Sequence, residues 1–212
     1  MKNRILKAMV FLWICAVIVF SFIFLSPVKD LGETARIIVF HVPTAWIASL
    51  AFFVGTYHSI MYLRTKKLSH DLRALSSEEL GFFFCILATL TGSIFAKAVW
   101  HSFWNWDPRE TSIFVLLLIY GAYFALRGAT EGERRRTLAS VYATLAFVSV
   151  PFLVFAVPRI TYSLHPDIKL GFGEVDIFYR SALFASVFGF SAIYLWLYRL
   201  RVSIEERRPQ NE

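Results

Sequence analysis

Long apolar runs separated by short polar stretches dominate the chain of 212 residues. A helix needs roughly 20 mostly apolar residues to cross a hydrocarbon core about 30 Å thick. Six runs approach this length, and they cover residues 6–25, 37–63, 80–98, 112–126, 138–157 and 179–198. The fourth run is too short for a full crossing, so a helix there has to begin inside the preceding loop. The pattern predicts six transmembrane helices.

The first apolar run follows the basic segment MKNRILK and therefore resembles a secretory signal peptide. Its apolar part is longer than the h-region of such a peptide, and no small-residue cleavage site follows it. We interpret it as an uncleaved membrane helix. No linker, repeat or low-complexity run divides the chain. We therefore expect one all-α integral membrane domain over residues 1–212, a bundle of six transmembrane helices.

Composition and charge support this interpretation and orient the bundle. The chain is 57% hydrophobic and 17% aromatic, with a mean hydropathy of +0.57, well above a soluble average. Of the 22 Lys and Arg residues, 15 fall on the side that holds both predicted termini and 7 on the other. Because positive loops stay in the cytoplasm, both termini are predicted to be cytoplasmic. The net charge of +7 then favours anionic lipid headgroups over nucleic acid as a partner.

The loop between the third and fourth runs, about residues 99–112, contains the segment WHSFWNWDPRETS and half of the six tryptophans. Tryptophans at this depth commonly anchor helix ends at the membrane interface. Three within seven residues exceed what anchoring requires. Asp107, Pro108 and Glu110 match an N-cap, a first helical position and a capping box. We expect a helix that starts there to hold the aromatic loop rigidly.

Two histidines are predicted on the same outer face as this loop. His41 lies in FHVPTAW at the start of the second span, and His165 lies in YSLHPD of the fifth loop. Each alone has a plain alternative, which is a hydrogen bond to a neighbouring loop for His41 and a surface position for His165. His58 lies 17 residues after His41 and so roughly 25 Å deeper. His70 is expected in a cytoplasmic loop, so neither of these two reaches the outer site.

Two imidazoles beside a broad aromatic surface, without an acidic cluster, suit a flat apolar ligand with a metal at its centre. Haem is such a ligand, and two imidazoles can ligate its iron axially. In this interpretation Trp100, Trp104 and Trp106 stack on the macrocycle, and Trp46 extends the surface. His101 is left open as a further ligand, a partner of a propionate or a bystander.

The propionates of a haem require cations, and guanidinium groups make the better carboxylate fork. The outer-face candidates are Arg36, Arg109, Arg159 and Lys169. A zinc hydrolase is excluded because the sequence has no H-E-x-x-H motif and no His-carboxylate cluster. Cys15 and Cys85 lie in mid-span, 70 residues apart, and are interpreted as packing residues rather than a thiol-exchange pair.

The spacing W-x-x-x-W-x-W-D in WHSFWNWD resembles the "WWD" signature of the haem-handling proteins of cytochrome c maturation. FHVPTAW and SLHP stand at matching places, and the resemblance covers essentially the whole chain. Length and layout are most similar to CcmC, the small branch, rather than to the longer CcmF and CcsA haem lyases. The resemblance implies that His41 and His165 are axial ligands of haem b. It also implies that the haem is held by Trp100, Trp104, Trp106 and Asp107.

The same resemblance implies a role in the bacterial cytoplasmic (inner) membrane. The protein would take haem at the outer, periplasmic face and deliver it to a CcmE-like haem chaperone, together with CcmA-, CcmB- and CcmD-like ABC transporter subunits. This is haem transfer rather than enzymatic bond-making. The segment from Pro108 to Thr111 is closer to the larger lyases than to the small branch. A CcsA-type subunit that works with a CcsB-like partner and passes haem directly to apocytochrome c is therefore an alternative.

Two further classes are weaker alternatives. A cytochrome b-like redox subunit usually stacks paired histidines within its spans, and the predicted spans contain no such pairs. A transporter that moves haem across the bilayer would place polar or ionisable residues along the span interiors. The predicted spans contain few.

Overall fold

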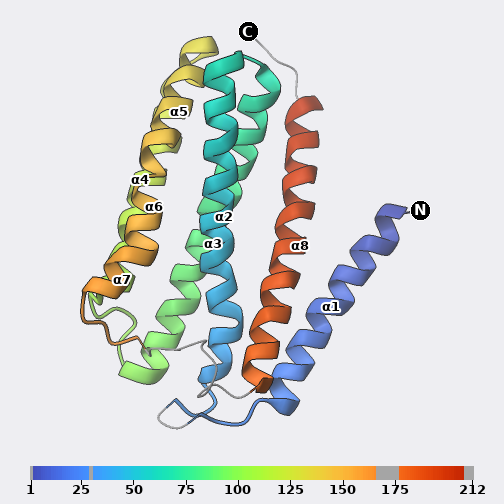
Figure 1. Cartoon of the computed structure of the whole chain (residues 1–212), viewed down its shortest axis with the longest axis vertical. Coiled ribbons are helices and arrows are strands. Elements are labelled where there is room, and N and C mark those ends of the chain that lie inside the picture. Colours follow the sequence, from blue (N-terminus) through green and yellow to red (C-terminus); the bar gives the residue numbers. More distant parts are fainter. Residues whose placement is uncertain (1, 29–30, 166–176, 208–212) are drawn as a thin grey trace.

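The computed structural model describes residues 2–28, 31–165 and 177–207, and its regular structure over these ranges is helical (Figure 1). Six helical segments are long and apolar enough to cross a membrane. They are Arg4–Phe24, Ala35–Thr65, Leu68–Trp100, Pro108–Gly128, Gly132–Ile160 and Ile177–Arg207. Over these ranges, the prediction of an all-α fold with six helices long and apolar enough to span a membrane is confirmed.

Five of the six spans are single helices: α1 (Lys2–Phe24), α2 (Ala35–Thr65), α3 (Leu68–Trp100), α4 (Pro108–Gly128) and α8 (Ile177–Arg207). The remaining span is divided into α5 (Gly132–Ala146), α6 (Ser149–Pro151), η1 (Phe152–Ala156) and α7 (Val157–Ile160). The segment η1 is a π-helical turn between two prolines, Pro151 and Pro158. Because proline has no amide hydrogen, it interrupts the regular i to i−4 pattern, and π-helical turns accommodate such interruptions.

The third span corrects the predicted boundaries. It was expected to begin near residue 80, yet α3 begins at Leu68, so His70 lies in a helix and not in a cytoplasmic loop. Only Lys66 and Lys67 separate α2 from α3. Lys66 adopts a left-handed conformation (φ 56°), and its amide donates to the carbonyl of Tyr62, which ends α2. The polar residues 68–79, which suggested a loop, form the first turns of α3, and several of them are buried against other helices.

The fourth span begins at Pro108, as the capping pattern predicted. The Asp107 side chain accepts a hydrogen bond from the amide of Arg109, and the Glu110 side chain reaches back to the amide of Asp107. The short fourth run thus gains four residues from the preceding loop and two at its other end, and α4 reaches 21 residues.

The antiparallel α2–α3 hairpin forms the middle of the bundle, with α8 and α1 on one side and α4 to α7 on the other (Figure 1). Within the core, the Phe52 ring stacks on the Tyr120 ring with 3.5 Å between centroids. The loops after α1, α3 and α7 lie together at one end, which we call the site end. The opposite end, where α2 turns into α3 and α8 finishes, is called the terminal end.

Candidate functional site

A cavity of about 740 Å³ lies between α2, α3, α4, the η1–α7 segment and the loop that follows α7. Its volume falls within the roughly 300–1,000 Å³ that small-molecule and cofactor sites occupy. Phe52, Cys85 and Leu116 line its inner part, which is apolar. Polar and charged side chains gather toward the site end, so the cavity is amphipathic along its length.

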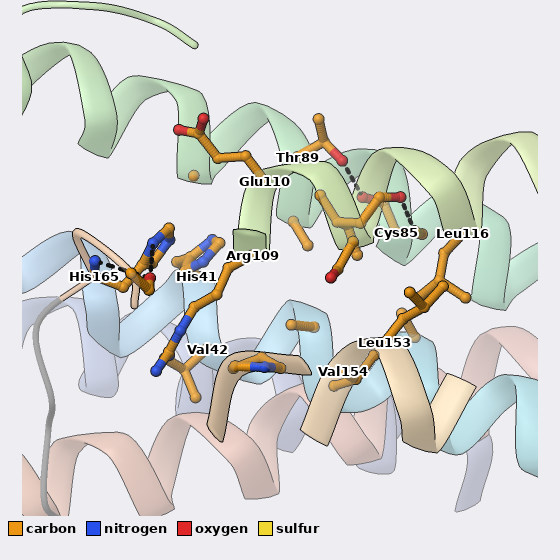
Figure 2. Close-up of a pocket in the computed structure, with 18 of the residues that line it drawn as sticks. His41, Val42, Cys85, Thr89, Arg109, Glu110, Leu116, Leu153, Val154 and His165 are labelled. Carbon is orange, nitrogen blue, oxygen red and sulfur yellow. Dashed lines mark hydrogen bonds between the residues drawn. The ribbon is translucent and has the colours of Figure 1, made fainter. Parts of the chain in front are cut away.

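Both predicted histidine ligands line this cavity, although 124 residues of sequence separate them. His41 comes from the second turn of α2, and His165 comes from the loop after α7. Figure 2 shows the two rings next to each other at one end of the cavity, with Cys85, Leu116 and Leu153 at the other. The structure therefore brings together one imidazole from a helix and one from a loop that is distant in sequence.

Asp107 fixes the orientation of the His165 ring. Its Oδ1 lies 3.0 Å from Nδ1 of His165, and its Oδ2 accepts a 2.6 Å hydrogen bond from the amide of Leu164. The hydroxyl of Ser163 donates to the same carboxylate at 3.0 Å. A carboxylate only accepts hydrogen bonds, so Nδ1 of His165 carries the proton and Nε2 has a free lone pair.

The electrostatics of this pair support that assignment. Burial raises the pKa of Asp107, but hydrogen bonds from the Arg109 and Leu164 amides and the Ser163 hydroxyl outweigh burial, and the pKa lies below its usual value. Burial lowers the pKa of His165, an effect that Asp107 opposes. Asp107 is thus ionised and His165 neutral near pH 7, and neutral imidazole is the form that binds metals.

Thr91 orients the His41 ring in the same way. Nδ1 of His41 lies 2.9 Å from Oγ1 of Thr91, and that hydroxyl lies 2.8 Å from the carbonyl oxygen of Leu87. Because a carbonyl can only accept, the single hydroxyl hydrogen of Thr91 belongs to that bond. With the Thr91 hydroxyl directed to Leu87, Nδ1–H of His41 donates to Thr91 and Nε2 carries the lone pair.

Gly92 gives the His41 ring its space. A Cβ atom at Gly92 would lie 3.0 Å from Cε1 of His41, closer than side chains ordinarily pack. A glycine in a helix interior costs about 1 kcal/mol relative to alanine. The close approach of the imidazole accounts for its presence at this position.

The four predicted tryptophans occupy different places around the cavity. Trp46 and Trp104 line it. Trp100 does not, but packs edge-on against the His165 ring at 5.1 Å between centroids. Trp106 is 70% exposed, has a left-handed backbone (φ 56°) and contacts the Trp104 ring edge-on. The four indoles therefore do not form one continuous stacking surface. Trp46 and Trp104 belong to the cavity wall, Trp100 supports His165, and Trp106 is exposed.

Two of the predicted cations line the cavity, namely Arg109 and Arg159. Arg109 extends into the region near His41 and Val42 (Figure 2). Arg36 is engaged elsewhere, because its guanidinium donates to the carbonyl of Leu25 and pairs with Glu33. Lys169 lies outside the described residues.

The other histidines lie apart from this cavity. His101 ends α3 in a left-handed conformation (φ 62°), and Nζ of Lys97 donates to its backbone carbonyl. His58 and His70 meet at the terminal end, where their Nδ1 atoms are 3.1 Å apart. The prediction that His58 and His70 do not reach the outer histidines is confirmed.

Sequence reasoning missed several groups that build the site. No sequence motif indicated that Thr91 and Ser163 contact the histidine site, or that Glu110 has a second role besides the capping box. Glu110 completes the capping box, and its Oε2 also accepts a 2.7 Å hydrogen bond from the amide of Asn105, which fixes the tryptophan loop. In the described part of the chain, no three His, Cys, Asp or Glu side chains gather as a metal cluster.

Known proteins are similar to this chain over most of its length. A family model described as "Heme exporter protein C" matches residues 2–212. Heme exporter protein C of Paracoccus denitrificans is 30% identical over 181 residues, which cover 84% of this chain and 75% of that protein. The protein of the same name from Escherichia coli K12 is 30% identical over 185 residues, again 84% and 75%.

A mitochondrial relative matches a shorter part. The "putative cytochrome c biosynthesis ccmC-like mitochondrial protein" of Marchantia polymorpha is 31% identical over 126 residues, 59% of this chain. The match spans about half of that relative, 53% of its length.

Proposed function

Because the chain belongs to the heme exporter protein C family, we propose that it binds haem b in the cavity and passes it to an acceptor protein outside the membrane. Membership in this family agrees with the predicted resemblance to the small branch. Haem is the cargo, and the role of this chain is to hold and present it. The amphipathic cavity of about 740 Å³ matches a ligand with an apolar ring and a charged edge.

The proposal rests on one observation: two imidazoles line the same cavity, and each has a hydrogen-bond partner at Nδ1. His41 and His165 line one cavity, and each has its Nδ1 engaged by a partner, Thr91 and Asp107 respectively. Metal-bound histidines commonly donate their second ring nitrogen to such a partner, which fixes the ring and its tautomer. Both Nε2 atoms are in the form that ligates iron, so we assign His41 and His165 as the axial ligands.

The remaining side chains have complementary roles in the proposal. Arg109 and Arg159 supply guanidinium groups for the propionates. Trp46 and Trp104 contact the faces or edges of the macrocycle from the cavity wall. Trp100 and Asp107 act through His165, since one packs against its ring and the other bonds its Nδ1.

The site end is proposed to face the periplasm, because Lys and Arg are enriched at the terminal end. Trp106 and Tyr162 are 70% and 88% exposed there, beside the cavity. Exposed aromatic groups next to a ligand site suit a protein interface. We propose that a CcmE-like haem chaperone docks on them, while CcmA-, CcmB- and CcmD-like subunits complete the complex in the bacterial inner membrane.

Haem content of the purified protein tests this function. We expect a Soret band from wild-type protein and a loss of most of that band in His41→Ala and His165→Ala. His58→Ala is the matched control, because His58 is on the same helix as His41 but outside the cavity. An unchanged Soret band in both cavity variants contradicts the axial assignment.

The same preparation separates the proposal from a redox cytochrome. Haem delivery predicts at most one haem per chain, and it predicts transfer of that haem to an added apo-chaperone. A stoichiometry of two haems per chain would favour the cytochrome b-like alternative. Transfer to apocytochrome c without a chaperone would favour the CcsA-type alternative.

A further inference from the structure

Glu78 is an acid buried inside the bundle without a partner. Its side chain is 0% exposed, and neither carboxyl oxygen has a hydrogen-bond partner among the described residues. It lies about a third of the way along α3, in the part that the sequence suggested was a loop. Because α3 begins at Leu68, this carboxyl lies within a helix, against Gly55 of α2 and within electrostatic range of Tyr120 on α4 and Tyr194 on α8.

The nearest acids behave differently. Glu79, the next residue, forms a bidentate pair with Arg201 at 2.6 and 2.8 Å. Asp71 forms a bidentate pair with Arg127 at 2.8 and 2.7 Å. Within the described ranges, Glu78 alone of these three has no cation beside it. An isolated carboxylate in such a place is far costlier than a neutral acid, so burial favours the protonated form.

The helix packing leaves room for this carboxyl. A Cβ atom at Gly55 on α2 would lie 2.3 Å from Oε1 of Glu78. A glycine within a helix and a buried acid both reduce stability. Among the residues described, no hydrogen bond to the Glu78 carboxyl offsets this cost. An ionisable residue within membrane-spanning helices is by default a functional candidate.

Other unpartnered polar groups lie around Glu78. The hydroxyls of Ser59, one turn beyond Gly55 on α2, and of Tyr120 on α4 are buried and lack hydrogen-bond partners in the described structure. Among the described residues, the hydroxyls of Tyr120, Tyr123 and Tyr194 are titratable groups within electrostatic range of Glu78. Buried polar groups that lack protein partners commonly bind internal water.

Phe52 contacts both the cavity and residues beside this cluster. Phe52 lines the cavity, stacks on Tyr120 and packs against Gly81, which is one turn from Glu78 on the same face of α3. Phe52 is therefore the side chain past which water from the cavity would have to move to reach Glu78.

We propose that Glu78 is a proton-binding site: it carries a proton in the resting protein and exchanges it with water that enters from the cavity past Phe52. In each exchange the O–H proton passes to a water molecule, and a proton from water replaces it, so that the carboxyl remains neutral. An exchangeable proton in the bundle interior is what a proton-coupled step in membrane transport requires. The proposal concerns the protein without haem and is independent of the axial assignment.

Infrared spectroscopy of the purified, haem-free protein tests it. The difference spectrum between wild type and Glu78→Gln is expected to contain the carbonyl band of a protonated carboxylic acid, and the band is expected to shift downward in D2O. Glu79→Gln is the matched control, because Glu79 is paired with Arg201 and its difference spectrum should show only carboxylate bands. Labelling the wild-type glutamates with carbon-13 at the carboxyl reports the same band without any substitution.

Two outcomes would overturn the proposal. Absence of the acid band, with a carboxylate signal assigned to Glu78, would show an ionised group that holds a cation. An acid band that does not shift in D2O while the protein stays folded would show a sealed structural acid without exchange.

Discussion

Two pairs of histidines lie at opposite ends of this bundle, and His41 and His165 are the pair that lines the cavity described above. At the site end, His41 and His165 each bond a different partner through Nδ1. At the terminal end, His58 and His70 face each other, Nδ1 to Nδ1, at 3.1 Å. The residue type is the same at both ends, and the partners of Nδ1 decide which ring nitrogens stay available.

The acids near the two histidine pairs also have different partners. At the terminal end, acids pair with arginines, as in Asp71 with Arg127, and the pairs fasten one helix to another. At the site end, Asp107 has no arginine pair among the described contacts and instead fixes a loop amide and an imidazole. We infer that the terminal end stabilises the bundle while the site end orients ligand groups. Four substitutions test this division.

The largest expected effect is on stability at the terminal end. Arg127→Leu leaves the buried Asp71 carboxylate without its cation, and losing one partner of a buried pair typically costs about 3–5 kcal/mol. Denaturant unfolding in detergent should show this loss, whereas haem bound per folded molecule should not change. The double variant Asp71→Leu with Arg127→Leu should regain most of the stability. If the double variant is as unstable as the single one, the buried charge is not the cause.

The next effect concerns Asp107. Asp107→Asn keeps an acceptor for the helix cap but removes the charge that holds the proton on Nδ1 of His165. Removal of such a partner of a metal-bound histidine typically weakens metal binding about 10–100-fold. Haem titration should measure this decrease, with the helix content by circular dichroism unchanged. Equal haem affinity in Asp107→Asn and wild type would contradict the orienting role.

A smaller effect is expected from Thr91. Thr91→Val has nearly the same shape but cannot accept the hydrogen bond from Nδ1–H of His41, so haem affinity should fall about tenfold, at the lower end of that range. Thr89→Val is the matched control, because Thr89 lines the cavity but its hydroxyl bonds the carbonyl of Cys85 in its own helix and not a histidine. The comparison fails if both variants lose affinity to the same extent.

The smallest effect is expected at His101, whose left-handed backbone favours glycine. Removing the Cβ atom from a left-handed residue stabilises the folded state by about 1–2 kcal/mol. The greater flexibility of glycine in the unfolded chain offsets about 0.5–1 kcal/mol of this gain. His101→Gly should therefore raise the free energy of unfolding slightly and leave haem binding unchanged. A loss of haem in this variant would show that the His101 ring belongs to the site.

The parts of this structure that depend on local pattern could be predicted from the sequence. Six apolar runs gave six helices, and the Asp107 capping box marked the start of α4. These features follow from the length of an apolar run and from residue types three positions apart. The alternation of loops then placed His41 and His165 at the same end.

The parts that depend on distant contacts could not be predicted. The polar start of α3 is covered by other helices, since Ser77 bonds Tyr194 from α8 and Asp71 bonds Arg127 from α4. Likewise, Asp107 and His165 are 58 residues apart, and no motif signals that they touch. The outward position of Trp106 follows from its left-handed backbone, which sequence spacing does not reveal for an aromatic residue.

Imidazole rescue of the haem-loaded protein tests the central assignment most directly. Electron paramagnetic resonance of the ferric wild-type protein should show a low-spin signal from two imidazole ligands. His41→Gly and His165→Gly should each lose that signal and regain it when free imidazole is added, whereas His58→Gly should keep it throughout. A low-spin signal that persists in both glycine variants without added imidazole would contradict the account.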